Sequence, residues 1–203
     1  MIAFAITDAL VTVGAILGIY LLWPHRRDGK VRMIRFGLGF MGFAALIGVI
    51  RFASGQVDEM AVAHSQASEF AGAAGLMLIA VALLLKTNAA KVDVGVIRYV
   101  RYGIPAVVAF LMFFPGTGTI VGFLPMLAFI IGLIASGLLV LHGQRSAGLA
   151  WLAGFFVIAF ASIVVGASRT ESTLGITDWH IYHALVGVWA VMVGEATKRL
   201  WDR

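Results

Sequence analysis

Residues 2–23 read IAFAITDALVTVGAILGIYLLW, and this stretch decides the fold. It holds one acid, Asp8, and no basic residue. As an α-helix it would be about 33 Å long, enough to cross a hydrocarbon core of about 30 Å. Six further apolar runs of similar length follow, at 34–53, 67–86, 96–114, 120–141, 148–167 and 179–197. The sequence therefore predicts an all-α fold, a single bundle of seven transmembrane helices that uses the whole chain, 1–203.

The overall composition agrees with a chain surrounded by lipid. Hydrophobic residues make up 61% and charged residues 12%, against about 25% charged in soluble domains. There is no cysteine, which excludes disulfides, thiolate metal sites and cysteine nucleophiles. The basic residues that give the net charge of +5 lie mainly beside the apolar runs. This placement is typical of residues that orient a membrane protein, rather than of a surface that binds nucleic acid. We expect membrane lipids, and no nucleic acid, as partners.

The basic residues predict the orientation, because lysine and arginine favour the cytoplasmic side of membrane spans. With seven spans, 13 of the 15 basic residues fall on one side, and only Arg51 and Arg169 fall on the other. The 13 are Arg26, Arg27, Lys30, Arg32, Arg35, Lys86, Lys91, Arg98, Arg101, Arg145, Lys198, Arg199 and Arg203. We therefore expect the N-terminus outside and the C-terminus in the cytoplasm.

Two further patterns concern how the helices are organised. His25 follows the first run as His142 follows the fifth, and the segments 37–41 and 148–152 have related sequences. Either two three-helix repeats flank a central helix, or glycine- and leucine-rich spans resemble each other by chance. Gly14 and Gly18 are spaced for close helix packing.

Ionisable residues gather near the outer ends of the predicted spans. Asp8, Arg51 and Glu69 are the costly ones, since a charge at mid-membrane costs about 2.5–3.5 kcal/mol on insertion scales. One interpretation is an Arg51–Glu69 ion pair that joins the second and third spans. The other is a polar pocket that opens to the outside.

A histidine pair marks the start of the last span. His180 and His183 are three residues apart, so a helix brings both near one side, one turn apart. With His64 as a third ligand they could hold zinc, because catalytic zinc takes three protein ligands and a water. The same residues, with Trp179 and Tyr182, also fit an aromatic belt at the membrane interface. His25 and His142 lie among basic residues, and we interpret them as interfacial.

Three patches carry a resemblance to a known superfamily. They are Thr7-Asp8-Ala9-Leu10, Gly48-Val49-Ile50-Arg51-Phe52 and the segment 178–185, DWHIYHAL. In these patches and in its architecture the chain resembles the seven-span hydrolases that include alkaline ceramidases and the adiponectin-receptor type. It also resembles small bacterial seven-span proteins. The spacing in the last span differs, with two residues between the histidines where the superfamily has three.

The resemblance implies a zinc-dependent hydrolase acting on a lipid amide or ester at the outer face of a membrane, here the inner membrane of a bacterium. The implied zinc ligands are His64, His180 and His183. Glu69 or Asp8 would position water or act as base, and Arg51 would hold an anionic group. Two other functions stay open from the sequence: a non-enzymatic subunit of a larger membrane complex or homo-oligomer, and a small-solute transporter or sensor built on the repeats.

Overall fold

A computed structural model describes residues 1–87 and 92–202 of the chain. Lys91 and Arg203, two of the basic residues used to predict the orientation, lie outside these ranges. The α-helices are α1 Ile2–Leu21, α2 Gly29–Ala53, α3 Ala61–Phe70, α4 Leu76–Thr87, α5 Val94–Phe113, α6 Gly118–Leu141, α7 Arg145–Ala159 and α8 Asp178–Trp201. A short 3-10 turn, η1 (Trp23–His25), follows α1.

Two π-helical segments make some of these helices continuous. The segment η2 (Ala71–Gly75) joins α3 to α4, and η3 (Phe160–Val165) extends α7. The described chain thus forms seven helical rods. A two-stranded hairpin, β1 (Ser172–Thr173) and β2 (Ile176–Thr177), precedes α8. The expected all-α class is confirmed.

Six rods are long and apolar enough to cross a membrane, which supports an integral membrane protein. They are Ile2–Leu21, Gly29–Ala53, Ala61–Thr87, Val94–Phe113, Gly118–Leu141 and Arg145–Val165. The last rod, α8, has 24 residues but is not in this set. Polar and aromatic side chains in its first two turns and charges in its last two lower its apolar content.

Two helices begin earlier in the chain than the sequence predicted. The second helix was expected to begin at residue 34, but the Asp28 carboxylate accepts the backbone N–H groups of Lys30 and Val31 and starts α2 at Gly29. The third rod was expected at residue 67 and begins at Ala61. Apolar content marks the part of a helix in lipid, whereas capping and backbone hydrogen bonds set its real ends.

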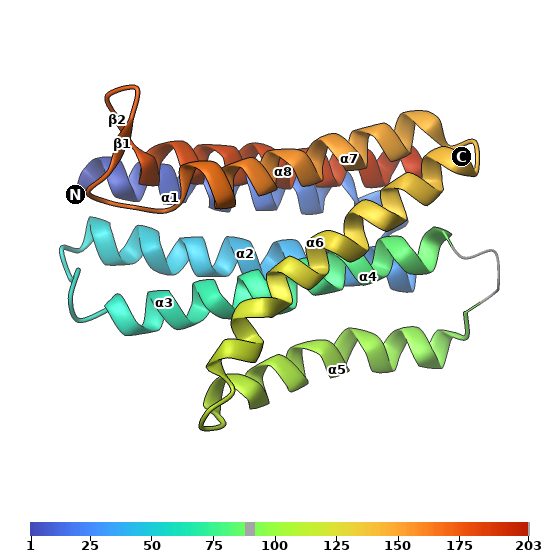
Figure 1. Ribbon diagram of the computed structural model, residues 1–203, viewed down its shortest axis with the longest axis horizontal. Coiled ribbons are helices and arrows are strands. Elements are labelled where there is room, and N and C mark those ends of the chain that lie inside the picture. Colours follow the sequence, from blue (N-terminus) through green and yellow to red (C-terminus); the bar gives the residue numbers. More distant parts are fainter. Residues whose placement is uncertain (88–91, 203) are drawn as a thin grey trace.

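The helices form a closed ring with one helix outside it. Each of α1, α2, α4, α6, α7 and α8 packs against the next, and α8 returns to α1. Helix α5 lies outside this ring, with its closest contacts to α6, α2 and η2, and Figure 1 shows it apart from the others. These neighbour relations are what two three-helix repeats flanking a central helix would give.

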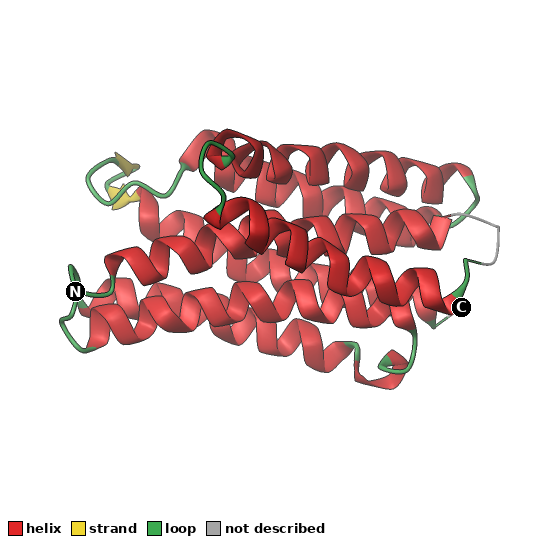
Figure 2. Cartoon of the chain, turned by 90° about the horizontal axis from the view of Figure 1, so that it is seen from below, coloured by secondary structure: helices red, strands yellow, loops and turns green. Residues whose placement is uncertain are grey.

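The chain connections gather at the two ends of the bundle, as Figure 2 shows. Figure 1 places the N-terminus and the hairpin at one end and the C-terminus at the other. The end near the N-terminus is called the N-terminal end below. The opposite end carries η1, the start of α2 and the end of α8, and is called the basic end.

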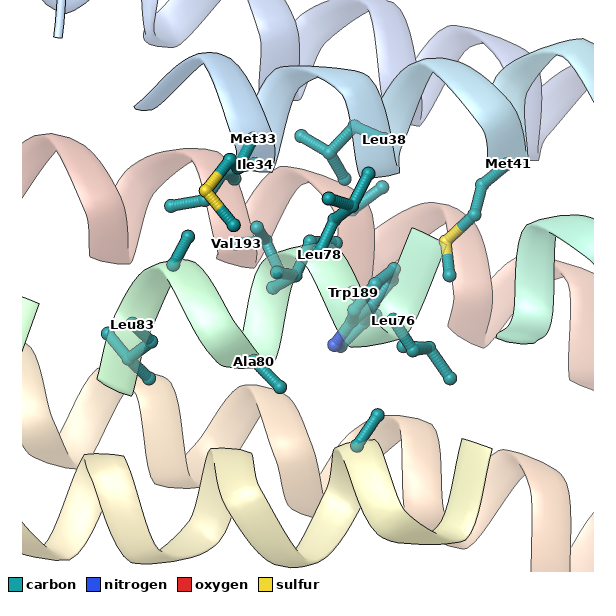
Figure 3. Close-up of a cluster of buried hydrophobic side chains, with 14 of the residues drawn as sticks. Met33, Ile34, Leu38, Met41, Leu76, Leu78, Ala80, Leu83, Trp189 and Val193 are labelled. Carbon is teal, nitrogen blue, oxygen red and sulfur yellow. The ribbon is translucent and has the colours of Figure 1, made fainter. Parts of the chain in front are cut away.

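The core lies where α2, α4 and α8 meet inside the ring (Figure 3). Leu38, Leu78 and Trp189 are completely buried there. Met41 and Leu76 lie at one edge of this cluster and also line a cavity described below.

Helices α1 and α8 pack more closely than the helices around the core. A Cβ on Gly18 would lie 2.5 Å from the carbonyl oxygen of Ala190, so the two backbones touch. The expected close packing at Gly14 and Gly18 is confirmed.

Candidate functional site

A fully buried carboxylate lies near the N-terminal end of the ring. Asp8, in the second turn of α1, has 0% exposed surface. It fits against α2 because Gly48 has no side chain: a Cβ there would collide with Asp8 Oδ2 and lie 2.8 Å from His64 Nε2. Asp8 and His64 therefore meet over Gly48. Neither Asp8 oxygen has a hydrogen-bond partner of good geometry among the described residues.

His183 reaches the same carboxylate from α8. Its Nε2 lies 3.0 Å from Asp8 Oδ1, and its Nδ1 lies 2.8 Å from the carbonyl oxygen of Trp179. A carbonyl oxygen can only accept, so Nδ1 carries a hydrogen and donates it. In a neutral ring, Nε2 then presents a lone pair to a carboxylate oxygen, which repels it. A cation, either a proton or a metal ion, is needed between the two atoms.

Trp179 and Arg51 hold the two histidines in place. The Trp179 ring stacks on His183 with 4.2 Å between ring centroids. Arg51 Nη1 lies 3.3 Å from His64 Nδ1, and Arg51 Nε donates to the carbonyl oxygen of Val57 at 2.6 Å. Because a guanidinium has no acceptor, His64 Nδ1 accepts in this pair. Arg51 is 6% exposed and fixes the orientation of His64.

The predicted ion pair between Arg51 and Glu69 is not among the ion pairs of the described residues. Glu69 is exposed and lies more than a turn beyond His64. The side chain that Arg51 meets on α3 is His64. Helix rotation decides this, since only one side of α3 faces α2.

The predicted ligand set of three histidines is not assembled. His180 Nδ1 lies 3.2 Å from Thr7 Oγ1, and its ring lies 4.8 Å from that of Phe4. His183 instead contacts Asp8, so the two histidines meet successive residues of α1. Across residues 1–87 and 92–202, no three His, Cys, Asp or Glu side chains gather as a metal site. Asp8 instead lies beside His183, and His64 lies on the other side of the Gly48 position, where Arg51 contacts it.

A cavity of about 620 Å³ adjoins this cluster. Its wall is largely apolar and is formed by α1, α2, α3, α4, α6, α7 and α8 and by both π-helical segments. The polar side chains on the wall are His64, Ser68, Glu69, Ser162, Tyr182 and His183. Asp8 lies behind the two histidines and does not line the cavity. Exposed lining residues, such as Met126 on α6 and Ile163 on η3, place its opening on the side of the bundle.

The two π-helical segments were not expected from the sequence. Ala71 and Gly72 of η2, and Ser162 and Ile163 of η3, all line the cavity. Such segments are rare and often occur at functional sites. Ser162 also interacts through its side chain with Tyr182 of α8. A small-residue run at 71–75 is the only sequence signal at η2, and it is too common to predict a π-helix.

Comparison with family models, with curated protein sequences and with solved structures gives no significant match.

Proposed function

We propose that the protein is a membrane lipid hydrolase, and that all seven rods cross the membrane with the N-terminus outside. The support for a seventh span is the packing of α8. Gly187 and Gly194 of α8 meet the backbone of α1 at Leu10–Val11 and at Gly18, in the middle and near the end of that helix. At 24 residues α8 is about 36 Å long, and it carries no Asp, Glu, Lys or Arg between 179 and 194. A helix packed along a spanning helix lies at the same depth.

The orientation follows the charges. Arg26, Lys30 and Lys198 lie at the basic end, and we assign this end to the cytoplasm, in keeping with the excess of lysine and arginine there. The resemblance to bacterial seven-span proteins favours the inner membrane of a bacterium. The buried cluster and the cavity then lie in the outer half of the membrane.

One observation carries the proposed activity: a cation is required between Asp8 Oδ1 and His183 Nε2, beside an apolar cavity that opens sideways. A volume of about 620 Å³ is in the range of small-molecule sites and accommodates an acyl chain. The lipid would enter from the bilayer with its amide or ester carbonyl near His64 and His183. Glu69, on the same wall, would position water. Arg51 serves by orienting His64 and not by holding an anionic substrate.

Zinc is the proposed cofactor, and the residues fit it in part. Asp8 and His183 would hold it, because Asp8 Oδ1 lies 3.0 Å from His183 Nε2 and His183 gives its other nitrogen to a backbone carbonyl, as metal-binding histidines commonly do. His64 is the third candidate, although its Nδ1 is occupied by Arg51. His180 is not one of the proposed zinc ligands. The chemistry that zinc supplies in such sites is ionisation of a bound water near neutral pH.

The test compares His183→Ala and Asp8→Asn with a matched control, His180→Ala, one turn away on α8. Zinc content of the purified proteins and turnover of long-chain acyl amides and esters in lipid nanodiscs are measured. Wild type and the control should retain about one zinc per chain and their activity. The two site variants should lose the metal, with activity falling at least about a hundredfold, as expected for loss of a group acting on the reacting atoms.

A different outcome would favour a second function. Both ring nitrogens of His183 are engaged in the structure, which also suits a structural role in a non-enzymatic membrane subunit. In that case a proton lies between Asp8 and His183. Wild-type protein would then hold no zinc and hydrolyse no lipid, while both site variants would lower the melting temperature.

A further inference from the structure

A group of arginines surrounds one tryptophan where α1 turns into α2, at the basic end. The Arg26 guanidinium carbon lies 4.9 Å from the centroid of the Trp23 ring, and that of Arg35 lies 5.2 Å from it. Arg26 Nη1 donates to the Trp23 carbonyl oxygen at 3.1 Å. Arg32 Nε donates to the Arg26 carbonyl oxygen at 3.0 Å. We call Trp23, Arg26, Arg32 and Arg35 the arginine elbow.

No acid neutralises the arginine elbow within the part of the chain that the structure describes. The ion pairs there join His25 to Asp202, His183 to Asp8 and Arg199 to Glu195. The nearest acid along the chain, Asp28, uses its carboxylate to cap α2. The charges that act on Arg35 are those of Arg26 and Arg32, which have the same sign.

Arg35 carries a buried guanidinium nitrogen, Nε, and no group of the described chain accepts a hydrogen bond from it. A buried charged donor without an acceptor is costly, so arginines at such positions are normally paired. Three guanidiniums held together by carbonyl groups and an indole ring, with no acid, form a preorganised anion site.

We propose that the arginine elbow binds the phosphate of an anionic phospholipid in the leaflet at the basic end. Guanidinium groups bind phosphate oxygens in a bidentate manner, and Arg is preferred over Lys for this. Trp23 is 53% exposed, and tryptophan favours the headgroup level of a membrane. A lipid phosphate is therefore available at the depth of Trp23. This site is separate from the cavity, which lies toward the N-terminal end.

The experiment measures bound lipid by native mass spectrometry after delipidated protein is incubated with phosphatidylglycerol or phosphatidylcholine. The variant is R26Q/R35Q, and the matched control is R98Q/R145Q, which removes two exposed cations from the same end. An arginine that bonds the lipid phosphate directly should contribute about fivefold to binding, whereas an exposed arginine away from the bound lipid contributes little when no membrane surface is present. Wild type should prefer phosphatidylglycerol, R26Q/R35Q should bind it about 25-fold more weakly, and the control should stay within about twofold.

A second variant, R26K/R35K, keeps the charge but not the planar guanidinium. It should fold as wild type does and still lose most of the preference. Equal losses in R26Q/R35Q and R98Q/R145Q would overturn the proposal, because diffuse charge would then explain binding. So would stabilisation by inorganic phosphate or glycerol phosphate to the same extent as by phosphatidylglycerol, since the site would then serve a soluble anion.

Discussion

At the scale of single residues, the chain keeps an acid inside a membrane helix by placing a glycine opposite it. Asp8 is completely buried, and the absent side chain of Gly48 is what lets its carboxylate lie against α2 beside His64. A charge in this position is costly unless other groups compensate it. His183, with a nitrogen 3.0 Å away, is the group placed to do so.

Gly48→Ala should therefore destabilise the protein. The new methyl group would collide with the Asp8 carboxylate and press on the His64 ring, so both side chains would have to shift. We expect a loss of about 1–3 kcal/mol, typical of overpacking, measured as a lower melting temperature in detergent. Gly39→Ala in the same helix is the control, because no atom of the described chain lies within 4 Å of its Cβ position. Equal melting temperatures for the two variants would contradict the placement of Asp8.

At the scale of elements, α1 and α8 pack with their backbones in contact, so small residues set their distance. Gly18→Ala would place a methyl group 2.5 Å from the Ala190 carbonyl oxygen, which cannot move without separating the helices. We expect a loss of about 1–3 kcal/mol and weaker zinc retention, because Asp8 and His183 belong to these two helices. Gly137→Ala in α6, where the described chain leaves open space, should change neither property. A neutral Gly18→Ala would mean that α1 and α8 lie farther apart.

At the scale of the whole molecule, the orientation can be tested cleanly because the chain has no cysteine. Single cysteines are introduced at Asp58 and Ser172, at the N-terminal end, and at Arg27 and Gln144, at the basic end. In intact cells a membrane-impermeant thiol reagent should label the first two and spare the others until the membrane is opened. Labelling of Arg27→Cys in intact cells would reverse the orientation. Labelling of Ser172→Cys but not Asp58→Cys would refute an even number of spans between Asp58 and the hairpin.

The arrangement of the ring also bears on the repeat hypothesis. Exchanging α1, α2 and α4 with α6, α7 and α8 leaves every neighbour relation of the ring unchanged, and α5 remains outside. The sequence likeness between 37–41 and 148–152 is weak, but both segments lie in the second helix of their half. Any closed ring of six helices that contact in chain order has this symmetry, so duplication and chance resemblance both stay open as interpretations.

The sequence by itself determined the helices, their apolar lengths and the end of the bundle to which most charges belong. The length of an apolar helix and the end at which charges gather both depend on residues that are neighbours in the chain. The close packing expected from Gly14 and Gly18 likewise depends on their local spacing. The sequence also placed Asp8, Arg51, His64 and His183 at one end of the bundle. Their partners could not be predicted in this way: the structure places Arg51 against His64, and it places His180 against Thr7 and away from His64.

Only the tertiary structure decided which of these side chains meet. His183 lies beside Asp8, His180 turns to Thr7, and Arg51 contacts His64, because the rotation of each helix about its axis selects the side that faces a neighbour. That rotation is set by the packing of distant residues, such as Gly14 against Gly187. The cavity has the same origin, since it lies where seven α-helices and two π-helical segments leave space between their side chains. Local sequence fixes how long a helix is, but the fit of whole helices against one another fixes what it touches.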